Sequence, residues 1–197
     1  MSDQIVDPNA DLTVPPVSTL RCTTPSELYA TVPQIANFTK HSPAEDEDNY
    51  DYFERLKYST TPEDAVTFAA FAAETKIAIH WGMQSVHAIL PEPGPEDRPL
   101  LSAIAQWMQY SRNENRWQVL QLALFARRRT PLVYLGLAVG WSGGMIAPND
   151  PSRPPLWRSP SAINAALLTS VAQAGADRRS VNMAHILDFP AAFFRVH

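Results

Sequence analysis

The stretch LAVGWSGGMIAP contains a G-x-S-x-G pattern centred on Ser142. In α/β-hydrolases this pattern forms a turn between a strand and a helix, which presents a nucleophilic serine beside an oxyanion-binding N–H. An acid and histidines follow in the order that a catalytic triad needs, for example Asp177 and then His185 or His197. A small serine hydrolase that uses Ser142 is therefore one hypothesis.

The residues around Ser142 favour a different interpretation. Prolines begin shortly after Gly144, at Pro148, so a helix of useful length cannot follow the serine. The chain also lacks the strand–helix alternation of a hydrolase sheet. A helix that ends near Trp141, with Gly143 or Gly144 in a left-handed cap, explains the same residues. We therefore predict structural roles for Trp141, Gly143 and Gly144, and no catalytic residue.

Other residue types capable of chemistry are widely spaced. His80 and His87 share a helix face but lie about 10 Å apart along its axis, too far for one metal ion. Cys22 is the only cysteine, which excludes a disulfide framework and a cysteine-based metal site. The arginines at 127–129 fall where a helix C-terminus favours cations. We expect no metal and no cofactor.

Charge and hydropathy limit the partners and the compartment. The net charge of −4 and the pI near 5.7 do not favour nucleic acid or anionic membranes as partners. The N-terminus lacks the basic and apolar regions of a signal peptide, so we expect a cytoplasmic protein. Residues 130–149 carry no charge, but glycines and Pro148 interrupt them, which predicts a buried helix and no membrane insertion.

Pairs of Ser or Thr with Pro recur along the chain and predict helix starts. The hydroxyl can cap a free N–H, and proline at the first helical position loses no hydrogen bond. In three of these pairs an acid follows three residues after the hydroxyl: Glu27 and Glu45 fit a capping box, and Asp64 complements the helix dipole. The pairs are Thr24-Pro25, Ser42-Pro43, Thr61-Pro62, Thr130-Pro131 and Ser159-Pro160.

Apolar residues at three- and four-residue steps follow these starts, whereas no clear alternating strand pattern appears. We predict an all-α fold, a single domain of about six to eight antiparallel helices with a proline-rich connector. We divide the chain into a disordered tail (1–23), short helices with an acidic segment (24–58) and a helical core domain (59–197). The expected helices include a long one over 62–90 with a possible bend at Gly82, one near 101–111, one with Trp117, Leu120, Ala123 and Leu124 on its apolar stripe, and others over 131–141, 160–174 and 178–187.

An acidic segment precedes the core domain and interleaves carboxylates with aromatic rings. Aromatic residues provide anchoring area at interfaces, and carboxylates steer association. This predicts a docking surface for a protein partner, shared with the proline-rich connector around Trp157; a solvated helix face is the plain alternative. The candidate partner-binding residues are Glu45, Asp46, Glu47, Asp48, Tyr50, Tyr52, Phe53 and Trp157.

The segments TPEDAVTFAAFAA, AIAQWMQYSRNENRWQVLQLA, PLVYLGLAVGWSGGMIAP and SPSAINAALLTSVAQAG together resemble an uncharacterised bacterial helical family. Its members show a W-S-G-G-S-[LI]-A-P-like pattern after an Ala-rich helix; here Met145 replaces the small polar residue. The resemblance covers about Ser59 to the C-terminus and implies no catalytic residue. Members of the family are often encoded among type VI secretion genes, which implies a role in that system by association.

These observations predict a non-enzymatic adaptor or chaperone of type VI secretion that holds a secreted effector or a spike component. An immunity protein that neutralises a toxin is the first alternative, since an acidic protein complements a basic toxin. A serine hydrolase using Ser142 is the second. The oligomeric state stays open.

Overall fold

The structure is a computed structural model and describes residues 19–195. These residues form α-helices and short 3₁₀ turns, and the only β-type pairings among them are two isolated bridges, so the predicted all-α fold is confirmed. The elements are α1 (Pro25–Thr31), η1 (Pro33–Asn37), α2 (Asn49–Lys57), α3 (Glu63–Ala72), α4 (Thr75–Ile89), α5 (Arg98–Gln109), α6 (Asn113–Leu124), α7 (Pro131–Gly140), α8 (Arg158–Gln173), η2 (Ala176–Arg178), α9 (Arg179–Asp188) and α10 (Ala191–Phe194).

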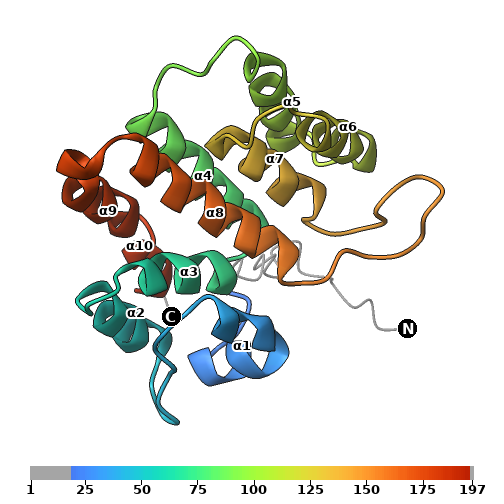
Figure 1. Cartoon of the computed structure of the whole chain (residues 1–197). Helices are drawn as coiled ribbons and strands as arrows, with labels where there is room; N and C mark the ends of the chain where they lie inside the picture. The colour runs from blue at the N-terminus through green and yellow to red at the C-terminus, as the bar shows by residue number, and fades with distance from the viewer. Residues whose placement is uncertain (1–18, 196–197) are drawn as a thin grey trace, which may run out of the picture.

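Helices α7 and α8 form the centre of the molecule. α7 packs against α6 and α8, and α8 packs in turn against α4 and α3. α5 and α6 lie at one end of the molecule, and α1 and α2 lie at the other (Figure 1). α7 approaches α6 closely because Gly140 has no side chain: a Cβ there would lie 2.4 Å from Leu120 Cδ1. No helix within residues 19–195 is long and apolar enough to cross a membrane.

Of the five predicted helix caps, two are confirmed and three are wrong. Thr61 does not cap α3 with its hydroxyl, because Pro62 is the N-cap residue and that helix has no side-chain cap. Thr24 Oγ1 and Thr130 Oγ1 each accept a hydrogen bond from the backbone N–H three residues later, at 3.2 Å. Ser42 begins no helix, because α2 starts at Asn49 with Asp48 as its N-cap. Ser159 lies inside α8, where its buried hydroxyl donates to the carbonyl oxygen of Ala138 at 2.9 Å. Burial against α7 thus decides the role of Ser159.

The predicted continuous helix over 62–90 is wrong, because the helix breaks at Ala73 and Glu74. Both residues are extended, with ψ values of 148° and 140°. At the break, backbone groups of α3 and α4 form hydrogen bonds with residues 19–21. Glu74 N donates to Thr19 O, and Arg21 N donates to Ala72 O, each at 2.8 Å. The hydrogen bonds missing from the helix are therefore made with a distant segment.

Residues 19–23 belong to the folded part of the chain, which corrects the predicted tail over 1–23. Leu20 is buried in the core, and Arg21 Nε donates to the carbonyl oxygen of Ala73 at 2.9 Å. Residues 1–18 of the predicted tail lie outside the described residues. Gly82 lies inside α4, and the side chain of Leu135 occupies the space that a Cβ would take.

One hydrophobic core runs through residues 20–194. An aromatic group joins α2, α3 and α10 within it: Phe68 lies 4.7 Å from Tyr52 and 5.3 Å from Phe194, measured between ring centroids, and Phe53 lies 4.8 Å from Phe194. Such rings contribute both buried area and favourable edge or stacked contacts. The short helix α2 is therefore fixed to the core by its aromatic face.

Candidate functional site

The aromatic side chains of the acidic segment do not form an exposed surface. Tyr52 and Phe53, which we predicted to anchor a partner, are both 0 % exposed. That prediction is wrong, because these rings form the face by which α2 packs onto α3 and α10. Tyr50 is half-buried, with the guanidinium of Arg195 over its ring. The burial of these rings agrees with the alternative interpretation of this segment, in which it is a helix with one solvated face.

The four consecutive carboxylates divide into two pairs. Glu47 receives two hydrogen bonds from Arg55, each at 2.7 Å, and this guanidinium lowers the pKa of the Glu47 carboxyl. Asp48 caps α2 by accepting from Asp51 N at 2.7 Å. Glu45 and Asp46 are exposed and make no hydrogen bond or ion pair with any described residue. Glu45 and Asp46 are therefore the pair of carboxylates that is free to contact a partner.

Ser142 lies directly after the end of α7. A helix precedes the serine, whereas the hydrolase turn needs a strand there, so the geometry of a nucleophile elbow is missing at this position. Gly143 and Gly144 both have positive φ values, +147° and +68°. The prediction that these glycines and Trp141, the C-cap residue, end a helix is confirmed.

Arg116 joins the end of α7 to the segment that follows it, residues 141–157, which we call the arm. Arg116 lies in α6, and only 4 % of the residue is exposed. Its Nη1 donates to Gly140 O at 2.7 Å, and its Nη2 donates to Asn113 Oδ1 and to Met145 O. Burial lowers the pKa of Arg116. The guanidinium thus donates hydrogen bonds to carbonyl groups at and after the end of α7. At most helix ends, backbone N–H groups donate to such carbonyls.

The arm also has a cation–aromatic contact at its far end. The guanidinium of Arg158 lies 5.4 Å from the ring centroid of Trp141 and 5.8 Å from that of Trp157. Trp157, a predicted partner-binding residue, is half-buried in this stack, whereas its neighbour Leu156 is 63 % exposed. The stack fixes the arm against the start of α8.

Gly144→Val is expected to lower the free energy of unfolding by about 2 kcal/mol. A branched residue at φ +68° is strained, and its Cβ would lie 3.0 Å from Asn113 Oδ1 and 3.1 Å from Arg116 Nη2. Urea denaturation of both proteins measures the difference. Ser142→Ala, two residues away in the same turn, is the control and should change this free energy by less than about 1 kcal/mol. Equal effects of the two substitutions would contradict the role given to Gly144.

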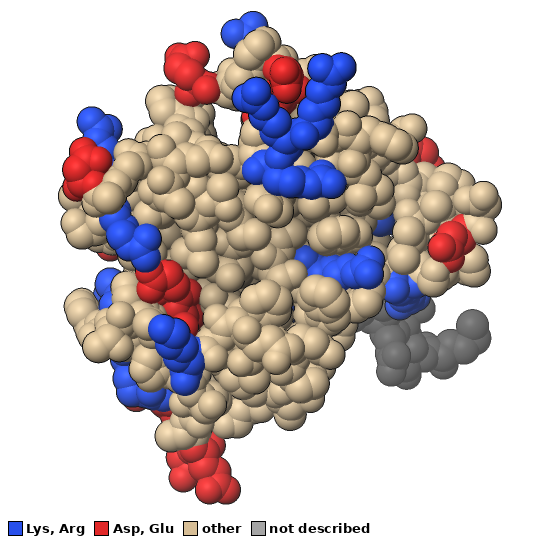
Figure 2. All heavy atoms as spheres, in the orientation of Figure 1, with Lys and Arg blue, Asp and Glu red and all other residues tan. Residues whose placement is uncertain are grey.

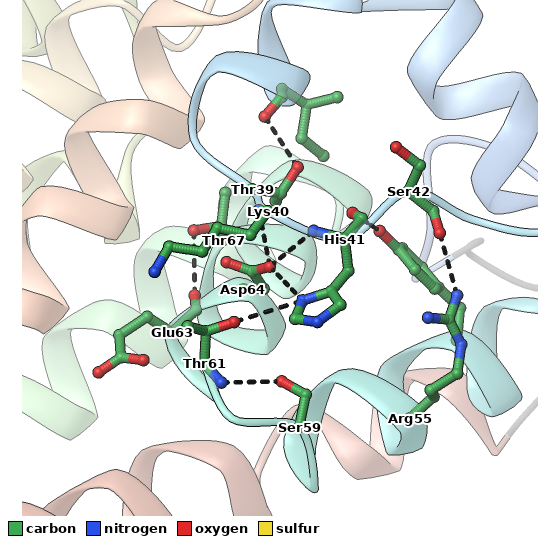
Figure 3. Close-up of polar contacts among 12 residues, drawn as sticks. Thr39, Lys40, His41, Ser42, Arg55, Ser59, Thr61, Glu63, Asp64 and Thr67 are labelled. Atoms are coloured by element: carbon green, nitrogen blue, oxygen red, sulfur yellow. Dashed lines mark hydrogen bonds and ion pairs between the residues drawn. The ribbon is translucent and has the colours of Figure 1, made fainter.

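A buried carboxylate at the start of α3 forms the second polar centre (Figure 3). Asp64 is 3 % exposed, and its Oδ2 accepts from Lys40 N at 2.8 Å and from His41 N at 3.0 Å. The same oxygen lies 2.8 Å from Nδ1 of His41, and Thr61 Oγ1 lies 3.3 Å from that nitrogen. Tyr52 donates its hydroxyl hydrogen to His41 O at 2.7 Å. These bonds hold residues 39–42 over α3.

The His41–Asp64 pair does not have the geometry of a catalytic triad. In a triad the nucleophile and the carboxylate contact opposite nitrogens of the imidazole, whereas Thr61 and Asp64 both contact Nδ1. Among residues 19–195 no cluster of three or more His, Cys, Asp or Glu side chains could hold a metal ion. The arrangement is suited to closing a loop, and sequence reasoning assigned Asp64 only to the helix dipole.

Two adjoining hollows lie where α4, α6 and α8 end and α5 and α7 begin; we call them together the end groove. Their volumes are about 730 Å³ and 300 Å³, and Gly94, Asp97 and Thr130 line both. Thr130 Oγ1 donates to Asp97 Oδ1 at 3.2 Å, so a hydrogen-bonded pair lies on the wall that the two hollows share. The larger hollow has apolar walls at Leu100, Leu122, Phe125 and Val133; the smaller has them at Met83, Val86, Leu90, Leu101 and Leu132.

Exposed apolar residues at the end of α6 form part of the wall of the end groove. Leu120 and Ala123 of the predicted stripe are buried, as expected. Arg116 and Val119 are buried in place of Trp117, which is half-buried, and Leu124, which is exposed. Three apolar side chains at the end of α6 lie outside its buried face, with exposures of 36 % for Leu122, 47 % for Leu124 and 80 % for Phe125. Contiguous exposed apolar residues mark interaction surfaces.

Charges of opposite sign border the end groove. Arg127 and Arg128 line the larger hollow and are exposed, and neither forms an ion pair or hydrogen bond with a described residue. Arg129 instead donates to Ala123 O at 2.8 Å and so caps α6, as predicted. Glu96 lines the larger hollow and Glu92 the smaller one, and both are exposed and without a described partner. In Figure 2 basic side chains gather where Figure 1 places α5 and α6, with acidic side chains close by.

Sequence reasoning missed both Arg116 and the end groove. A signal for Arg116 was present, because it lies three, four and seven residues before Val119, Leu120 and Ala123, and this spacing puts it on the apolar face of α6. The groove had no such signal, since five helix ends form it and their meeting is a property of the tertiary fold.

A protein family matches the part of the chain that contains most of these features. The model of a family of unknown function, DUF6931, matches residues 52–193. The matched range contains Arg116, the arm and the whole end groove, but neither His41 nor the carboxylates at 45–48. No curated protein and no solved structure matches the chain. Because the match covers well over half of its length, the chain belongs to the family of unknown function DUF6931.

Proposed function

We propose that this protein is a non-enzymatic, protein-binding accessory of a bacterial type VI secretion system, an adaptor or chaperone that holds a secreted effector or a spike component in the cytoplasm. The observation that supports binding is the end groove, with the exposed side chains of Leu122 and Phe125 and charged borders that have no described partner. The assignment to type VI secretion rests on the resemblance carried by the WSGGMIAP segment and its neighbouring helices.

An immunity protein is the second candidate. The exposed carboxylates of Glu45 and Asp46, without partners among the described residues, favour it because they would attract a basic toxin. This pair lies outside the matched range, whereas the end groove lies inside it. The groove therefore favours the adaptor as the function shared by the family. Nothing in the surroundings of Ser142 favours the hydrolase, since a helix and not a strand leads to it.

Deletion of the gene in its host, combined with co-purification of the tagged protein, tests the proposal. For an adaptor we expect loss of export of one effector or spike component, and the same component among the co-purified proteins. Death of the deletion strain beside toxin-armed siblings, with a toxin as the co-purified protein, would instead establish the immunity role. Unchanged export and unchanged survival would reject both.

A further inference from the structure

The end groove has features that specify what it binds. The hydrogen-bonded residues Asp97 and Thr130 line both of its hollows, so a ligand that fills the groove passes this pair with one apolar group in each hollow. Residues 19–195 contain no strand, and therefore offer no sheet edge to which an extended peptide could add. Proline-rich peptides dock in grooves lined by several aromatic rings, whereas Phe125 is the one such residue of the described chain that lines these two hollows. A helix laid in a groove needs only apolar walls, which its side chains contact at three- and four-residue steps.

The borders of the groove add a charge requirement. Arg127 and Arg128 follow the end of α6, whereas Glu92 and Glu96 lie in the α4–α5 connection, so the two signs of charge come from different elements that line the groove. All four side chains are exposed and make no ion pair within the described residues. Charged groups at an interface rim set the orientation and the choice of partner. A ligand with one sign of charge along both flanks meets repulsion at one border.

We propose that the end groove binds an amphipathic helix of the partner protein, whose apolar stripe enters the two hollows and is bordered by acidic residues toward Arg127 and Arg128 and by basic residues toward Glu92 and Glu96. This inference rests on the proposed protein-binding function and specifies the ligand. The apolar contacts supply affinity through Leu122 and Phe125 on the larger hollow. The charges supply selectivity among amphipathic helices.

Three synthetic helical peptides of about 18 residues test the proposal, since that length spans about 27 Å. All carry the same leucine stripe; one has glutamate on both flanks, one has lysine on both, and one has glutamate on one flank and lysine on the other. Fluorescence anisotropy measures their binding to the intact protein. The mixed peptide should bind best, by about fivefold or more over each of the others. The result does not depend on the direction of the helix, because a reversed helix exchanges its flanks.

Reversing the charge of either border should change which of the three peptides the protein binds most tightly. In the double variant Arg127→Glu/Arg128→Glu both borders are acidic, and the lysine peptide should become the tightest ligand. In Glu92→Lys/Glu96→Lys both are basic, and the glutamate peptide should become the tightest. Phe125→Ser should weaken all three peptides alike. Arg153→Glu, an exposed charge on the arm, is the matched control and should leave the ranking unchanged.

A ranking that ignores these reversals, or no binding of any peptide below about 1 mM, would overturn the proposal. A natural partner that still co-purifies with both charge-reversed variants would also overturn it, while leaving the proposed adaptor function in place. Failure to find any natural partner while the peptides show the expected exchange would reject the adaptor function and leave the groove as a helix-binding site.

Discussion

Replacing Arg116 by alanine is expected to lower the free energy of unfolding by about 3 kcal/mol. The guanidinium is buried and donates to Gly140 O, Asn113 Oδ1 and Met145 O. Hydrogen bonds from a charged donor contribute about 1.5–3 kcal/mol each, and the acceptors left behind are partly shielded from water. Urea denaturation measures the loss. Thermolysin, which cuts before apolar residues, should cut the variant faster at Met145 and Ile146, because the arm loses a principal contact.

Two variants separate this role of Arg116 from a general effect of charge. Arg112→Ala removes an exposed arginine one turn earlier and should change the free energy of unfolding by less than about 0.5 kcal/mol. Arg116→Lys keeps the charge but cannot direct several N–H groups at separate carbonyls, so it should recover less than half of the lost stability. Full recovery with lysine, or a stable alanine variant, would show that the acceptors do not need the guanidinium.

Local chemistry explains what the sequence predicted well. The end of α7 depends on Trp141 and two glycines, and the starts of α1 and α7 depend on a threonine three residues before the N–H that it caps. These interactions lie within a few residues of one another, so spacing and residue type determine them. The same applies to Gly175 after α8, which has φ +99° as a helix-terminating residue should.

Contacts distant in sequence explain what it predicted wrongly. The break at Ala73 and Glu74 has no proline or glycine to announce it, and its hydrogen bonds go to residues 19–21. Tyr52 and Phe53 lie among carboxylates in the sequence and have the composition of a docking segment, yet α3 and α10 cover them. Neither result is visible in the spacing of one segment, because each requires the position of a second one.

Asp64→Ala is expected to lower the free energy of unfolding by about 3 kcal/mol, comparable to the effect at Arg116. One carboxylate oxygen accepts from two consecutive backbone N–H groups, of Lys40 and His41, and also lies 2.8 Å from the His41 ring. Alanine leaves these donors without an acceptor at a nearly buried site. Glu45→Ala, an exposed acid in the same part of the protein, is the control and should have an effect below about 0.5 kcal/mol.

A double-mutant cycle between His41 and Asp64 shows whether the imidazole or the backbone contributes most. His41→Ala removes the ring but leaves both N–H groups bonded to the carboxylate, so it should cost only about 1 kcal/mol. The double variant should unfold with nearly the free energy of Asp64→Ala alone, because the ring has no partner once the carboxylate is gone. A larger loss at His41 than at Asp64 would contradict this. It would mean that the imidazole ring contributes more to closing the loop than the two backbone hydrogen bonds to the carboxylate.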